Sequence, residues 1–200
     1  MTSLDNSVPR PRVDVARVAD LYRQLLEAVG ENPEREGLRG TPERVARWWT
    51  EFLDHDAGRT DTVFEEDLPA GTDRLVIVRG IVAWSLCEHH LLPMRLELTI
   101  GYRPCGSVLG LSKFARIVSA HAHRLQLQER IVDGVAADVA KATGSADVGV
   151  VAEGAHLCMS MRGVRQDPAR TLNHSLSGAV ADGDTLGSQL LAAAGVAGRR

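Results

Sequence analysis

The chain has 200 residues, of which 44% are hydrophobic, and its formal net charge is −3. That length and apolar content suffice for one domain with a real core, and a charge so close to neutral gives no reason to expect nucleic acid as a partner. The sequence contains no apolar run of membrane-spanning length and no N-terminal leader, so we expect a cytoplasmic protein without a membrane partner. Its three cysteines fit metal binding or free thiols better than a disulfide framework, because their number is odd.

The first quarter of the chain predicts a lead-in followed by two helices. Residues 1–12 are polar and include two prolines, and we expect them to be disordered. Residues 13–29 repeat apolar side chains near helical spacing, as an amphipathic helix does. A second helix is predicted to begin with Thr41 as its N-cap and Pro42 in its first turn. We assign residues 13–55 to an N-terminal helical region.

The remainder is predicted to form one domain over residues 56–180 and a C-terminal tail over residues 181–200. The domain's expected elements are strands over 75–84, 96–100 and 148–152 and helices that begin near Ser112 and at Gln128. Runs of strands and helices in this arrangement indicate an α+β fold, with helices outside an antiparallel sheet.

A thiol and two imidazoles stand together in the stretch Cys87-Glu88-His89-His90. Cys87 and His90 are three residues apart, so one turn of backbone can direct a thiolate and a neutral ring nitrogen at the same zinc ion. Two ligands alone are a weak signal, and a buried cysteine beside surface histidines explains the pattern equally well. A third ligand is needed from elsewhere in the chain.

A third ligand is available in residues 156–162, whose strict alternation predicts a strand with two dissimilar faces. The polar face would carry His156, Cys158, Ser160 and Arg162. Cys87, His90 and Cys158 then provide three protein ligands, and an open fourth position would make the zinc catalytic rather than structural. His89 and His156 are left as candidate proton carriers.

Two predicted helix starts carry groups suited to a nucleotide. Ser112 is expected to cap a helix N-terminus, where free N–H groups favour an anion, and Lys113 and Arg116 add positive charge. Gln128 and Glu129 open the next helix, and a carboxylate beside an amide matches the donor edge of guanine. Ordinary capping explains both features as well, because polar and basic residues commonly occur at helix starts.

Five motifs, GLRGTPERVA, CEHHLLP, GLSK, RLQLQER and HxCMxMRGV, occur in this order and closely resemble GTP cyclohydrolase I. The resemblance covers most of the chain, from about residue 31 to residue 178. It implies a T-fold that closes into a toroidal homodecamer by sheet continuation, with sites at subunit boundaries. It also implies zinc-dependent opening of the imidazole ring of GTP at C8, release of formate and rearrangement to 7,8-dihydroneopterin triphosphate.

The resemblance also implies roles for individual residues. Zinc (Zn2+) would be held by Cys87, His90 and Cys158, and protons would be carried by His156 and His89. The base would be recognised by Gln128 and Glu129, with Ser112 near the ribose and Lys113, Arg116 and Arg162 on phosphates. For Arg44 and Arg47 the pattern alone favours a solvated basic face, whereas the resemblance associates them with the triphosphate.

The chain departs from the family pattern at several positions outside the metal and base-recognition motifs. Met94 and Arg95 stand where an aromatic residue and a glycine are usual, and Asn173, Val180, Gly187 and Gln189 replace other usual residues. We expect these changes to affect C-terminal packing and assembly rather than catalysis. Cys105 is interpreted as a bystander.

Two alternative functions stay open at this point. A related purine hydrolase of a specialised pathway could stop at a ring-opened product. A non-catalytic assembly partner could keep zinc for stability, although His89, His156 and Glu129 would then have no purpose.

Overall fold

The computed structural model describes residues 12–65, 74–181 and 185–196. The described residues up to Asp56 form one compact unit, and those from Ala57 onward form a second. The lead-in predicted over residues 1–12 lies, except for Arg12, outside the described residues. None of the helices within these ranges is long and apolar enough to cross a membrane.

The first unit is a pair of helices, α1 (Val15–Ala28) and α2 (Thr41–Leu53). Tyr22 and Trp49 join them through a hydrogen bond of 2.9 Å from the indole nitrogen to the phenol oxygen. The prediction that Thr41 caps α2 is wrong, because Gly40 is the N-cap and the Thr41 hydroxyl instead accepts from Arg44 at 2.7 Å. Pro42 lies in the first turn as predicted, where its missing N–H costs nothing.

The second unit is built on one five-stranded sheet. The strands of the whole unit, including two outside this sheet, are β1 (Val63–Glu65), β2 (Val76–Cys87), β3 (Pro93–Tyr102), β4 (Ser107–Leu109), β5 (Leu125–Gln126), β6 (Val148–His156) and β7 (Thr171–Leu176). Its helices are α3 (Leu111–Ala122), α4 (Gln128–Thr143), α5 (Leu157–Ser160) and α6 (Thr185–Ala193). The main sheet has the order β5-β2-β3-β6-β7, and β1 pairs with β4 separately. All neighbours are antiparallel except β2 and β5, so the α+β prediction is confirmed with a mixed sheet.

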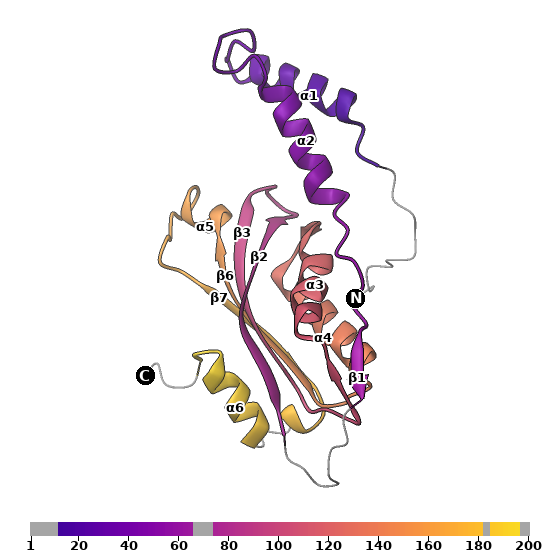
Figure 1. The fold of residues 1–200 in the computed structure, drawn as a ribbon. Helices are drawn as coiled ribbons and strands as arrows, with labels where there is room; N and C mark the ends of the chain where they lie inside the picture. Colours follow the sequence, from indigo (N-terminus) through magenta and orange to yellow (C-terminus); the bar gives the residue numbers. More distant parts are fainter. Residues whose placement is uncertain (1–11, 66–73, 182–184, 197–200) are drawn as a thin grey trace. The chain divides into compact units, whose positions relative to one another are not determined.

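The two faces of the sheet are covered by different helices. Figure 1 shows α3 and α4 on one face and α6 on the other. Leu96, Leu98 and Ile100 of β3 are fully buried in the core with α3 and α4, as their alternation predicted. Leu186 and Leu190 of α6 pack in a separate cluster on the opposite face. Each such buried aliphatic side chain stabilises the fold by roughly 1.5–3 kcal/mol.

The strand predicted over residues 156–162 is wrong. His156 is the last residue of β6, and the chain then forms the helical turn α5. The reason lies in the neighbouring strand: Met94 pairs with His156, so a further residue of β6 would face Pro93, which has no N–H to donate. The polar side chains expected on one face of that strand therefore do not lie on a common strand face; they are His156, Cys158, Ser160 and Arg162.

Candidate metal centre and active site

The candidate site is assembled where three strands of the sheet begin or end. β2 ends at Cys87 and β6 ends at His156, while β3 begins at Pro93. Leu86 pairs with Pro93 and Met94 pairs with His156, so these ends lie at the same edge of the sheet. Two segments far apart in the sequence thereby meet, as Figure 1 allows the reader to follow.

Cys87, His90 and Cys158 have their ligand atoms within 4.8 Å of one another. Sγ of Cys87 lies 3.8 Å from Nδ1 of His90. A tight turn brings them together, because the N–H groups of His90 and Leu91 both donate to the Cys87 carbonyl, at 3.3 and 2.8 Å. Leu91 adopts a φ of 54°, a left-handed conformation that is strained for a leucine and that the surrounding turn must enforce.

The donor set of this cluster fits a zinc ion. Two sulfurs and one imidazole nitrogen are the ligands that zinc prefers, and tetrahedral bonds of about 2.0–2.3 Å would place ligand atoms roughly 3.3–3.8 Å apart. Burial raises the pKa of the Cys158 thiol, and the neighbouring Cys87 raises it further. A dication would remove this cost by favouring the thiolate form of both cysteines.

His156 lies half-buried at the end of β6, two residues before Cys158. Its Nε2 is 2.7 Å from Oε1 of Gln128. Burial lowers the pKa of His156, and the charge of Glu129 acts in the opposite direction. The ring therefore combines partial burial, which favours its neutral form, with a nearby carboxylate that can stabilise its protonated form.

Gln128 and Glu129, expected to act together on a base, lie in different environments. Gln128 is 1% exposed, and its amide nitrogen donates to the carbonyls of Ala152 and Thr171 at 2.9 and 3.1 Å. Glu129 is exposed, and Asn173 donates to its Oε1 at 3.4 Å. The carboxylate is accessible to a ligand, whereas the amide of Gln128 is used within the protein.

The other candidate residues are more scattered. His89 is exposed, with its ring 6.3 Å from that of His90 and perpendicular to it. Arg162 is also exposed, and its charge offsets a small part of the rise in the pKa of Cys158 that burial and Cys87 cause. The expectation that Ser112 caps α3 is wrong, because Gly110 is the N-cap and Ser112 lies exposed within the first turn.

The remaining basic candidates are accessible. Lys113 is half-buried, and exposed Arg116 donates to the carbonyl of Ala57 at 3.3 Å. Arg44 and Arg47 are exposed on α2, in the first unit, and their role in phosphate binding stays a prediction.

Two contacts at the site were not predicted from the sequence. Arg130 of α4 makes a two-point ion pair with Glu88, which stands between Cys87 and His89. Asn173 of β7 contacts Glu129. A signal was present for the first, since Glu88 and Arg130 both lie within motifs that carry the family resemblance. Their pairing across 42 residues could not be inferred from spacing.

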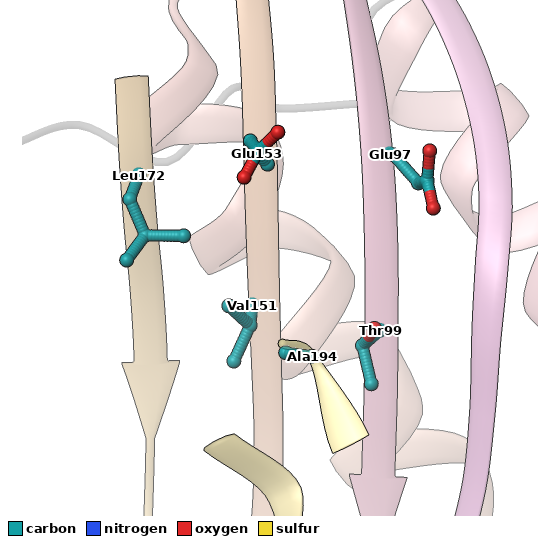
Figure 2. Close-up of a pocket in the computed structure, with 6 residues that line it drawn as sticks. All are labelled: Glu97, Thr99, Val151, Glu153, Leu172 and Ala194. Atoms are coloured by element: carbon teal, nitrogen blue, oxygen red, sulfur yellow. The ribbon is translucent and has the colours of Figure 1, made fainter. Parts of the chain in front are cut away.

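A separate pocket lies on the sheet face that carries α6. Figure 2 shows it lined by Glu97, Thr99, Val151, Glu153, Leu172 and Ala194. Glu97 and Glu153 are directly opposite in the register of β3 and β6, an arrangement of like charges that is unfavourable. Arg95, 3.8 Å from Glu97, offsets part of this repulsion. The pocket includes none of the candidate site residues.

Comparison with known proteins connects the site to one family. Residues 18–194 match the family model described as GTP cyclohydrolase I. GTP cyclohydrolase 1 of Hyperthermus butylicus is 51% identical over 154 residues, which cover 76% of this chain and 77% of that protein. The Rhodopirellula baltica enzyme is 44% identical over 180 residues, covering 88% and 77%. The Pseudoalteromonas atlantica enzyme is 40% identical over 171 residues, covering 85% and 93%.

A solved structure of an archaeosine synthase QueF-like protein in the apo form aligns less closely. It has a TM-score of 0.45 and 20% identity, and covers 54% of this chain and 96% of that one. This likeness is too weak to add to the family assignment.

Proposed function

The chain belongs to the GTP cyclohydrolase I family and is a hydrolase that converts GTP to 7,8-dihydroneopterin triphosphate, and we propose that Cys87, His90 and Cys158 form its zinc site. The observation that carries this proposal is the convergence of these three ligand atoms to within 4.8 Å. Zinc held there would supply the Lewis acidity that makes water nucleophilic near neutral pH.

The residues around the cluster are suited to positioning guanine and moving protons. Glu129 presents an exposed carboxylate that can accept hydrogen bonds from the N–H groups of guanine. His156 lies close enough to Glu129 to respond to its charge and stands beside the cluster, so we assign it the transfer of protons to and from the opening imidazole ring. His89, exposed beside His90, is the second candidate carrier.

The triphosphate is assigned to basic side chains that are accessible in this structure. Exposed Arg116 and Arg162 and half-buried Lys113 can make charge-assisted hydrogen bonds to phosphate oxygens, with Ser112 near the ribose. Arg44 and Arg47 are proposed for the same role. Arg162 is favoured for a phosphate near the metal because its charge already reaches Cys158.

We further propose that the second unit is a T-fold and that subunits close into a toroidal homodecamer, with sites completed at subunit boundaries. The family assignment supports this assembly. None of the three cysteines is in a disulfide, which suits a reducing, cytoplasmic environment.

The test is incubation of the zinc-loaded protein with GTP while formate and pterin fluorescence are measured together. Both signals are expected, at equal amounts. Formate without fluorescence would favour the alternative in which the reaction stops at a ring-opened product. Bound zinc without formate would favour a non-catalytic assembly partner.

The ligand assignment is tested with a matched pair of cysteine variants. Cys158→Ala is expected to lose both zinc and turnover, because two remaining ligands bind zinc poorly. Cys105→Ala, at an exposed free cysteine, should retain both. Full zinc content in Cys158→Ala would show that the ligand set is wrong.

A further inference from the structure

Gln128 is buried directly against His156. It is the first residue of α4 and is 1% exposed, and its Oε1 lies 2.7 Å from Nε2 of His156. Because the surroundings exclude water from the amide, each of its polar atoms needs a partner within the protein.

The other contacts of Gln128 determine which way its amide faces. Its Nε2 donates to the backbone carbonyls of Ala152, at 2.9 Å, and Thr171, at 3.1 Å. A flipped amide would place an acceptor oxygen against two acceptor oxygens, so Oε1 must be the atom that faces His156. An amide oxygen only accepts, so His156 donates from Nε2, and in the neutral ring the lone pair lies on Nδ1.

The backbone leaves a space for this amide at Gly154. A Cβ added to Gly154 would overlap Oε1 of Gln128 and would lie 2.9 Å from its amide carbon. Gly154 pairs with Thr171 between β6 and β7, so the same pair of strands supplies both the space and the carbonyl acceptors. Its backbone is not in the left-handed region, so room for Gln128, rather than conformation, accounts for a glycine here.

We propose that Gln128 is a positioning residue that holds His156 in the Nε2–H tautomer, so that Nδ1 is the atom that accepts and returns protons. This inference deepens the proposed function and rests on His156 being the proton carrier of that reaction. It also removes the side chain of Gln128 from guanine recognition, because both of its amide atoms are already paired. Recognition of the base is then left to the adjacent Glu129.

Three variants separate positioning from substrate binding. Gln128→Met keeps the length of the side chain and removes its hydrogen bonds, and should lower kcat roughly 10- to 100-fold, as loss of such supporting contacts does. KM for GTP should stay within about twofold and zinc content should be unchanged, since a positioning residue does not touch the base. Gln128→Glu keeps an acceptor for His156 and should retain more of kcat than Gln128→Met. Gly154→Ala should lower kcat by displacing the unaltered Gln128 amide.

Thr143→Val is the matched control, because it also removes a buried hydrogen bond from α4, at 2.8 Å to the Val139 carbonyl, but at the other end of the helix. It should keep the kcat and KM of the wild type. Wild-type kcat in Gln128→Met, or a raised KM with unchanged kcat, would overturn the inference. Equal kcat values in Gln128→Glu and Gln128→Met, together with an unimpaired Gly154→Ala, would also overturn the inference. This holds even where one of the two Gln128 variants folds poorly, because Gly154→Ala leaves the Gln128 side chain itself unaltered. Absence of formate release by the wild type would instead overturn the proposed function, and this inference with it.

Discussion

Arg130 and Glu88 form a two-point ion pair at the base of the proposed metal turn. One guanidinium nitrogen lies 2.8 Å from Oε2 of Glu88 and the other lies 3.3 Å from Oε1. The first also reaches Oε1 of buried Gln126 at 3.2 Å. The hydrogen bond from Arg130 is the main cause of a lowered pKa at Glu88, followed in that direction by the charges of Arg130 and His89. The turn from Cys87 to His90 is thereby tied to helix α4.

Removing this tie is expected to weaken the metal site without touching a ligand. Arg130→Met keeps the aliphatic stem and should reduce zinc affinity roughly 10- to 100-fold, the usual cost of losing a contact that orients the ligands. Arg130→Lys should have a zinc affinity between those of the wild type and Arg130→Met, because an ammonium retains the charge but not the two-point geometry. Zinc titration with a competing chelator measures the affinity.

Arg35→Met provides the control for loss of an ion pair as such. Arg35 lies 3.0 Å from Glu31 at an exposed position of the first unit, and exposed pairs contribute little. Zinc affinity equal to that of the wild type in Arg130→Met would show that the ion pair does not support the site.

Glu129→Gln is predicted to impair recognition of GTP while leaving the metal in place. The carboxylate can accept from two guanine N–H groups, whereas the amide would place a donor against one of them, and such mismatches are costly. KM for GTP should rise at least tenfold, with zinc content unchanged. Glu153→Gln, an exposed glutamate of the separate pocket, is the control. An unchanged KM in Glu129→Gln would remove this residue from base recognition.

Stability should depend on pH through Asp138 of α4. His121 of α3 lies 2.8 Å from its carboxylate, and this hydrogen bond, more than the charges of His121 and Lys141, holds the pKa of Asp138 below its usual value. A carboxyl group whose pKa is lowered by folding stabilises the fold above its unfolded pKa of about 3.9, and the contribution disappears as pH falls through the folded value. The carboxylate side chain is 41% exposed, which limits the contribution to about 1 kcal/mol or less.

Asp138→Asn should therefore be less stable than the wild type at pH 7, and the difference should shrink as the pH is lowered below about 4. Urea unfolding at several pH values measures it. Asp133→Asn, at an exposed position of the same helix, should show no such trend. A difference between Asp138→Asn and wild type that stays constant down to pH 3 would contradict this account.

Local patterns predicted the parts of the fold that depend on local chemistry. Alternation located the buried face of β3, and three-residue spacing located the turn that brings Cys87 near His90. Tertiary pairing decided the rest. Residue 157 leaves the sheet because its would-be partner is Pro93, and Gln128 is buried while Glu129 is exposed because of how α4 lies against β6 and β7. In both cases the deciding residues lie in another part of the chain, so they cannot be identified from the local sequence of residue 157 or of α4.

The last prediction concerns the divergent C-terminal segment, which forms α6 against the sheet. Gly101 of β3 and Gly149 of β6 are paired residues, and together they leave a recess that Leu190 fills at 0% exposure. A Cβ at Gly149 would overlap Cδ2 of Leu190, and one at Gly101 would lie 2.9 Å from its Cδ1. Gly187 is explained in the same way, because its added Cβ would meet the Val180 carbonyl.

Leu190→Ala should therefore cost about 2–5 kcal/mol of stability, as expected for emptying a filled apolar recess. Gly149→Val should release α6 by steric conflict, so both variants should lose amide-exchange protection over residues 185–193. Gln189→Ala, at an exposed neighbour, is the control. Zinc content should be unaffected in all three, because Gly149 lies near the start of β6 whereas the metal cluster adjoins its end. Protection over α6 that is unchanged in Gly149→Val would mean that the helix is held by contacts other than this recess.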